Sequence, residues 1–144
     1  MKILALICFL GIFLSVYGDS HFLFMAKYAK YYSDCDSEPA TALNRDDFKN
    51  AMSGKPFNAE QAAYFFCLNT KFGVQNEQGD YVREPLKKFF KHIVVNQDNI
   101  EKIVEICSTR PGGSSAKDAA LSLFNCAKKI DNLHFPFQHF TIEA

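Results

Sequence analysis

The chain has 144 residues, of which 15 are Phe, and its 16 basic side chains balance 16 acidic ones. A formal net charge of zero provides no field that would steer the protein toward nucleic acid or an anionic membrane surface. The length is that of one domain, large enough to bury a hydrophobic core.

The first 18 residues have the features of a cleaved secretory signal. Lys2 gives a positive start, an apolar run follows from Ile3 to Leu14, and small residues lie near Gly18. A membrane anchor is the alternative, but a helix needs about 20 apolar residues to cross a bilayer. We therefore predict a signal peptide at 1–18, a secreted extracellular domain at 19–144, and no stable membrane insertion.

Four cysteines remain once Cys8 leaves with the signal, and an even number in an oxidising compartment predicts two disulfides. Three pairings are possible for four cysteines. A zinc site is disfavoured because no two of them show the close spacing of zinc ligands. The four residues are Cys35, Cys67, Cys107 and Cys126.

Apolar residues recur at helical spacing between regular turn signals, which predicts six short helices and no strand. In chain order, the first predicted helix has its apolar face from Phe22 to Tyr32 and is broken at Ser37 to Ala40, and the second is capped by Asn44 and ended by Gly54. The third runs from Ala59 to about Phe72, the fourth from Pro85 through His92, the fifth from Asp98 to Cys107, and the sixth from Ala116 to Ile130.

Individual residues support these boundaries. Asn58 and Gln61 have the spacing of a capping box before the third helix, and Gly73 is placed to end it. Pro85 is tolerated only in the first turn of a helix and therefore marks the start of the fourth.

The last segment, Asn132 to Ala144, is too apolar for a solvated tail, and Pro136 prevents a continuous helix. We expect this segment to bury part of itself, with Phe135, Phe137 and Phe140 folding over or into the interior. Packing in a surface groove is the alternative.

Catalytic and cofactor chemistry find little support. The histidines have no partnered nucleophile, and there is no His-Glu-x-x-His or phosphate-binding glycine motif. A calcium loop centred on Gly79 would place Val74 first and Pro85 twelfth, and neither has a side-chain oxygen. We predict that the protein is not an enzyme and holds no metal or cofactor.

With helices and cysteines placed, the chain resembles the insect odorant- and pheromone-binding proteins, a secreted six-helix family with six cysteines. Ala63 and Lys117 stand where the family has its second and fifth cysteines, while the segment CLNTKFGVQNEQGDY is similar to the family's sequence after its third. The resemblance implies a compact six-helix bundle around a hydrophobic cavity. It also implies the pairs Cys35–Cys67 and Cys107–Cys126, and the four-cysteine "minus-C" branch.

The inward helix faces and the tail supply the expected ligand-lining residues, since pockets for apolar ligands are lined mainly by aromatic and aliphatic groups. Plain core packing is the alternative for each of them. Tyr28 and Tyr64 could offer a hydroxyl to a ligand or lie at the surface. The lining residues are Phe24, Met25, Tyr28, Phe48, Met52, Phe66, Leu86, Phe89, Phe90, Ile103, Leu123, Phe124, Phe135 and Phe137.

The resulting prediction is a secreted carrier that solubilises a small hydrophobic ligand such as an odorant, pheromone or fatty acid. A scavenger of host amines or lipid mediators on the same fold is one alternative, although amine binding would need an acidic pocket. A helical, disulfide-stabilised effector that acts on a receptor is the other. Histidines near the tail, His92, His134 and His139, raise the further hypothesis of pH-dependent ligand release.

Overall fold

The computed structural model describes residues 21–135, and within that range the chain is all-α and contains no strand. Residues 21–37 are helical, and five α-helices follow: α2 (Arg45–Met52), α3 (Ala62–Phe72), α4 (Arg83–Ile93), α5 (Ile100–Cys107) and α6 (Ala116–Ile130). The short 3-10 helices Ala59–Gln61 and Gln97–Asn99 lead into α3 and α5. The predicted all-α class with six helices is confirmed. The predicted signal peptide and the tail beyond Phe135 lie outside the described residues.

The helix ends follow from local hydrogen bonding. The Asn44 side chain accepts a hydrogen bond from the Asp47 backbone N–H at the start of α2. Both hydrogen bonds of the capping box between Asn58 and Gln61 are present. Gly73 ends α3 in the left-handed conformation, with φ of 74°. The caps predicted at Asn44, Asn58 and Gly73 are therefore confirmed.

Two helices extend beyond the residues from which they are predicted. The N-terminal helix continues five residues beyond Tyr32, the last residue of its predicted apolar face, and ends at residue 37, where the predicted break begins. The fourth helix starts at Arg83, so that Pro85 is its third residue. Proline is accepted throughout a first turn, because the N–H groups there have no partner within the helix.

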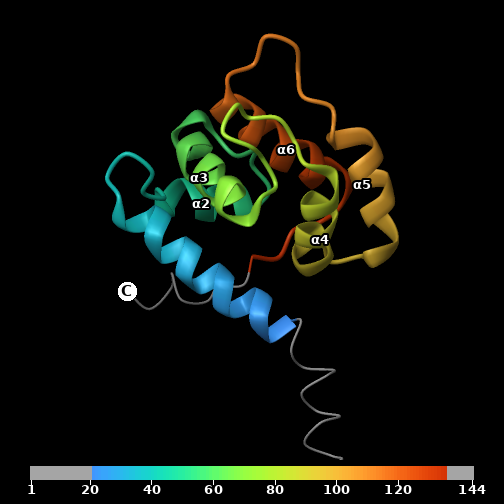
Figure 1. Cartoon of the computed structure of the whole chain (residues 1–144), viewed down its shortest axis with the longest axis horizontal. Coiled ribbons are helices and arrows are strands. Elements are labelled where there is room, and N and C mark those ends of the chain that lie inside the picture. Colours follow the sequence, from blue (N-terminus) through green and yellow to red (C-terminus); the bar gives the residue numbers. More distant parts are fainter. Residues whose placement is uncertain (1–20, 136–144) are drawn as a thin grey trace, which may run out of the picture.

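The bundle is built around α6, which packs against α3 and α5, while α5 also packs against α4. The N-terminal helix runs diagonally across one side of this group (Figure 1). It is held there by aromatic contacts, because Phe24 lies 5.4 Å from Phe72 of α3 and 5.8 Å from Phe89 of α4 between ring centroids.

Two disulfides tie the helices together. Cys35 at the end of the N-terminal helix is bonded to Cys67 of α3, and Cys107 at the end of α5 is bonded to Cys126 of α6. This is the pairing that the resemblance implies. Loops closed over 32 and 19 positions restrict the unfolded chain by about 3–4 kcal/mol each in the loop-entropy model.

Candidate functional site

Five phenylalanines meet at the centre of the bundle and form what we call the aromatic cluster. Phe48 comes from α2, Phe57 from the loop before α3, Phe65 from α3, Phe124 from α6, and Phe135 from the segment after α6. The ring centroids of Phe65 and Phe124 lie 4.5 Å apart, and those of Phe57 and Phe65 lie 4.7 Å apart. Such tilted and edge-to-face contacts are favourable between aromatic rings.

Phe135 lies in the middle of this cluster although it does not belong to a helix. Its side chain is 1% exposed, and its ring centroid lies within 6.2 Å of those of the other four phenylalanines. Two backbone hydrogen bonds hold the segment before Phe135 against the end of α4: Val95 N–H donates to the Asn132 carbonyl, and His134 N–H donates to the Ile93 carbonyl. The start of the tail is therefore buried as its composition predicts. Phe137 and Phe140 lie outside the described residues.

Polar groups also lie in the interior. Tyr28 and Tyr64 are buried and hydrogen-bonded to each other, and burial raises the pKa of both phenols above the ordinary value of 10. Gln61 is fully buried, and its Oε1 accepts the Asn58 N–H of the capping box. Its Nε2 has no hydrogen-bond partner among residues 21–135. A buried donor without a partner is unfavourable unless another group satisfies it.

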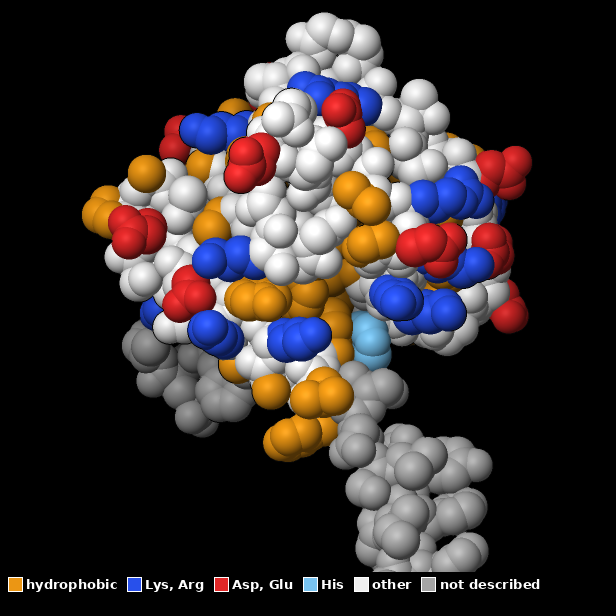
Figure 2. Space-filling model, in the orientation of Figure 1, with side chains coloured by type: hydrophobic (Ala, Val, Ile, Leu, Met, Phe, Trp, Pro, Cys, Tyr) orange, Lys and Arg blue, Asp and Glu red, His pale blue; other side chains and the backbone are white. Residues whose placement is uncertain are grey.

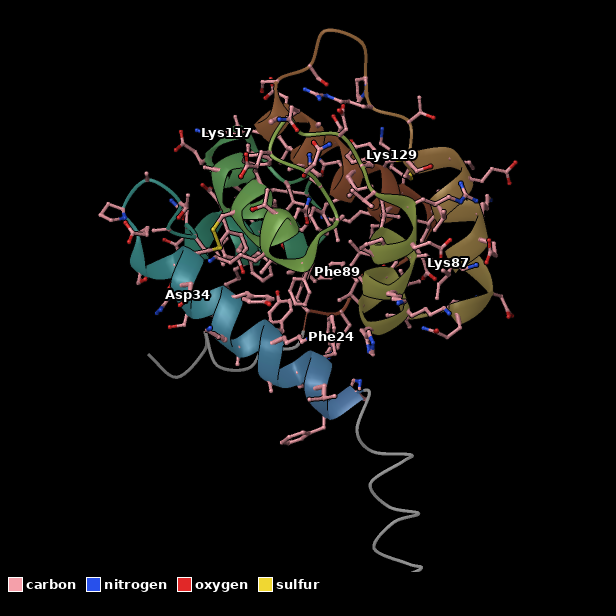
Figure 3. All side chains as sticks on the ribbon, in the orientation of Figure 1. Phe24, Asp34, Lys87, Phe89, Lys117 and Lys129 are labelled. Carbon is pink, nitrogen blue, oxygen red and sulfur yellow. A yellow bond between two sulfur atoms is a disulfide. The ribbon has the colours of Figure 1, made fainter. Side chains whose placement is uncertain are left out.

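A second feature is a groove at the surface between the N-terminal helix and α4, which we call the lysine-rimmed groove. It has a volume of about 430 Å³, and its apolar lining comes from Leu23, Phe24, Phe72, Pro85 and Phe89, with Lys27, Lys88 and His92 as its polar residues. Phe24 and Phe89 point toward each other from the two sides (Figure 3). In the space-filling view, hydrophobic side chains form a band in the lower centre, flanked by basic side chains (Figure 2).

His92 is one of the residues that line this groove. Its ring stacks on Phe24 at a centroid distance of 4.0 Å, and its Nδ1 lies 3.3 Å from Nδ1 of His21. Partial burial, followed by the nearby His21 and Lys91, lowers the pKa of His92. The imidazole is therefore mainly neutral at pH 7 and adds little charge to the groove.

The structure brings most of the predicted lining residues into one hydrophobic core. Met25, Met52 and Phe66 are partly exposed and pack against that core, and Phe137 lies outside the described residues. Whether any of them touches a ligand stays a prediction. The buried members are Phe24, Tyr28, Phe48, Leu86, Phe89, Phe90, Ile103, Leu123, Phe124 and Phe135.

Sequence reasoning missed several residues of these two features. Phe57 and Phe65 belong to the aromatic cluster, and Lys27 and Lys88 belong to the groove. Phe57 lies in a loop, where no periodicity marks an inward face. The two lysines become neighbours only through packing of elements about 60 positions apart in sequence, a relation that no local signal carries.

Within residues 21–135, no group of three or more His, Cys, Asp or Glu side chains is arranged to hold a metal ion. In the same range, no helix has both the length and the apolar character needed to cross a membrane.

Comparison with known proteins gives one positive result. The model of the PBP/GOBP family matches residues 23–130, which is about three quarters of the chain. The match begins in the N-terminal helix and ends at the last residue of α6, so it covers all six helices. No curated protein and no solved structure matches the chain significantly.

Proposed function

We propose that this chain, which belongs to the PBP/GOBP family, is a secreted carrier that holds one small hydrophobic molecule among the aromatic residues of its interior. The family is one of small-ligand carriers, which supports binding rather than catalysis. The predicted signal peptide, cleaved after Gly18, would deliver residues 19–144 to the extracellular fluid.

The observation that carries the proposal is the position of Phe135. A phenylalanine from a non-helical end segment fills the centre of a helical core, where it touches four other rings. Outward movement of this segment would break the two backbone hydrogen bonds that form the isolated bridge between Val94 and Leu133, and neither bond belongs to a helix. The vacated space would be apolar and aromatic, as expected of a site for a hydrophobic ligand.

Gln61 would supply the polar contact in such a site. Its buried Nε2 has no partner in the described chain, so a hydroxyl or carbonyl oxygen of the ligand would satisfy it. The two disulfides join the N-terminal helix to α3 and α5 to α6, so no disulfide joins α3 directly to α6. We assign the chain to the four-cysteine branch on this basis, and we expect an interior that adapts to ligands of different shape.

The alternative of an amine scavenger receives no support from the groove, whose lining contains two lysines and no carboxylate. A receptor-acting effector would use exposed apolar surface, and Phe22 and Leu23 are 70% and 54% exposed. That alternative predicts an interior that takes up no ligand.

Native mass spectrometry of protein secreted from an oxidising host tests the proposal. After delipidation, the wild type should bind dodecanol, a neutral apolar probe, with a stoichiometry of one, and its mass should correspond to a chain that starts at Asp19. The variant Phe135→Ala should bind dodecanol about 10-fold more tightly, because the ligand no longer competes with the ring.

The control is Phe22→Ala, which removes a phenylalanine that is 70% exposed. It should bind dodecanol as the wild type does. If neither the wild type nor Phe135→Ala takes up dodecanol or its carboxylate analogue dodecanoate, the carrier proposal is wrong and the effector is favoured.

A further inference from the structure

The lysine-rimmed groove combines an apolar floor with an unbalanced positive charge. Its floor includes Phe24 and Phe89, which are 8% and 2% exposed, so the floor is part of the hydrophobic core. Lys27 lies one helical turn after Phe24 on the N-terminal helix, and Lys88 lies next to Phe89 on α4. The two cations therefore come from opposite sides of one apolar surface.

Neither lysine forms an ion pair among residues 21–135, although other lysines nearby do. Lys71 of α3 pairs with Asp34, and Lys87 of α4 pairs with Glu101 of α5. The lining of the groove contains no aspartate or glutamate that would neutralise Lys27 or Lys88. Two exposed and unpaired cations beside a buried aromatic floor are complementary to a molecule with an anionic head and an apolar body.

The floor also connects with the interior. The ring of Phe89 lies 6.1 Å from that of Phe124, and Phe124 lies 5.9 Å from Phe135 between centroids. A row of touching rings thus leads from the groove to the residue that fills the aromatic cluster. The groove and the aromatic cluster are therefore parts of one continuous hydrophobic core.

We infer that the lysine-rimmed groove is the headgroup site for an anionic amphiphile, specifically a long-chain carboxylate, whose head is bound by Lys27 and Lys88. The inference rests on the proposed function and deepens it by naming the class of ligand. It also gives the ligand a direction, with the carboxylate at the surface and the hydrocarbon chain against Phe24 and Phe89. Charge complementarity favours this occupant over a neutral or cationic one.

The test compares two probes that share one hydrocarbon chain. Dodecanoate and dodecanol, each below the concentration at which it aggregates, are titrated at pH 7.5 into the wild type and into the double variant Lys27→Gln/Lys88→Gln. Because an exposed ion pair contributes up to about 5-fold in affinity, the double variant should bind dodecanoate about 10-fold more weakly. Its affinity for dodecanol should stay within about 2-fold of the wild type.

A matched control removes two other exposed lysines. Lys102 belongs to α5. Lys117 belongs to the start of α6, and in Figure 3 its label lies at the opposite edge of the molecule from that of Phe24. The variant Lys102→Gln/Lys117→Gln carries the same change of net charge and should bind both probes as the wild type does. Equal losses in the two double variants would show a general effect of charge and would overturn the groove site.

The outcomes separate this inference from the proposed function. If dodecanoate binding is unchanged in Lys27→Gln/Lys88→Gln while the wild type binds dodecanol, the carrier proposal stands and the headgroup site is wrong. If the wild type binds neither probe, the carrier proposal fails and the headgroup site fails with it. A selective loss of dodecanoate binding in the groove variant supports the site.

Discussion

The imidazole of His92 links the N-terminal helix to α4, because it stacks on Phe24 and lies against His21. Burial lowers its pKa below the ordinary value of 6.5, and His21 and Lys91 act in the same direction. The unfolded chain therefore binds a proton at this residue more readily than the folded chain does. Stability that is present above pH 6.5 is lost as the pH falls through the unfolded value toward the folded one.

We expect the variant His92→Phe to weaken this pH dependence while keeping a ring on Phe24. Between pH 7.5 and pH 5, the free energy of unfolding should fall less in the variant than in the wild type. The difference should be below about 1 kcal/mol, because the ring is partly exposed to solvent. Urea unfolding followed by circular dichroism across this range measures it. If the free energy of unfolding changes with pH in the same way for both proteins, His92 does not contribute to the pH dependence of stability.

Neighbouring phenylalanines show why residue-level prediction stops short of the site. Phe65 is fully buried in the aromatic cluster, whereas Phe66 is partly exposed at the edge of the core. Adjacent residues on a helix point about 100° apart, so a continuous run such as Tyr64 to Cys67 has no single inward face in the sequence. Which of the two phenylalanines is central is decided by packing against α6 and by the tail.

At the scale of elements, the loop between α3 and α4 fixes the start of α6. Gln75 accepts a hydrogen bond from Asn69, and its Nε2 donates to the carbonyls of Gly79 and Ala116. Gly79 has a φ of 92°, and a Cβ added there would lie 2.6 Å from the Cα and Cβ of Ala116. The close approach of this loop to α6 therefore depends on the absence of a side chain at position 79.

The variant Gly79→Ala should be destabilised by about 2–4 kcal/mol, since it combines an unfavourable backbone conformation with a clash against helix backbone. Urea unfolding should show a lower midpoint with a similar slope. The control is Gly112→Ala, where an added Cβ meets nothing within 4 Å and should leave the midpoint almost unchanged. A Gly79→Ala midpoint equal to that of the control would contradict this account of the loop.

Elements are predicted well here because their signals are local. A capping box, a left-handed glycine and a proline in a first turn each act within four residues, so local sequence signals mark both ends of the third helix and the first turn of the fourth. The N-terminal helix extends beyond its predicted apolar face because no residue between Tyr32 and Asp36 stops a helix. The sequence there contains no Gly or Pro before Pro39.

At the scale of the molecule, the six-helix class follows from the helical spacing of apolar residues, whereas the disulfide pairing is implied only by the family resemblance, since the cysteines alone leave three pairings open. The groove and the aromatic cluster cannot be predicted from the sequence in the same way. Each needs residues from at least three elements, and their relation depends on how the helices cross. Phe135 is an intermediate case, because its burial is predicted from composition and its partners are not.

The position of Phe135 leads to a prediction about the whole molecule. Without ligand, the variant Phe135→Ala should lose about 3–5 kcal/mol of stability, as expected when a buried phenylalanine is truncated. A ligand that binds only the folded chain restores stability in proportion to its affinity, and about 2.7 kcal/mol is gained at 100 times the Kd. At one fixed concentration of dodecanol, the rise in Tm should therefore be larger for Phe135→Ala than for the wild type.

The reason is that the variant offers the ligand an empty space, whereas the wild type must first release its own ring. Differential scanning calorimetry with and without dodecanol measures the rise in Tm for each protein. The variant Phe135→Leu removes less volume, so its rise in Tm should lie between those of the wild type and Phe135→Ala. Equal rises in all three proteins would mean that ligand binds away from the aromatic cluster. The ring of Phe135 would then be a permanent part of the core, and the tail would stabilise the fold without competing for the site.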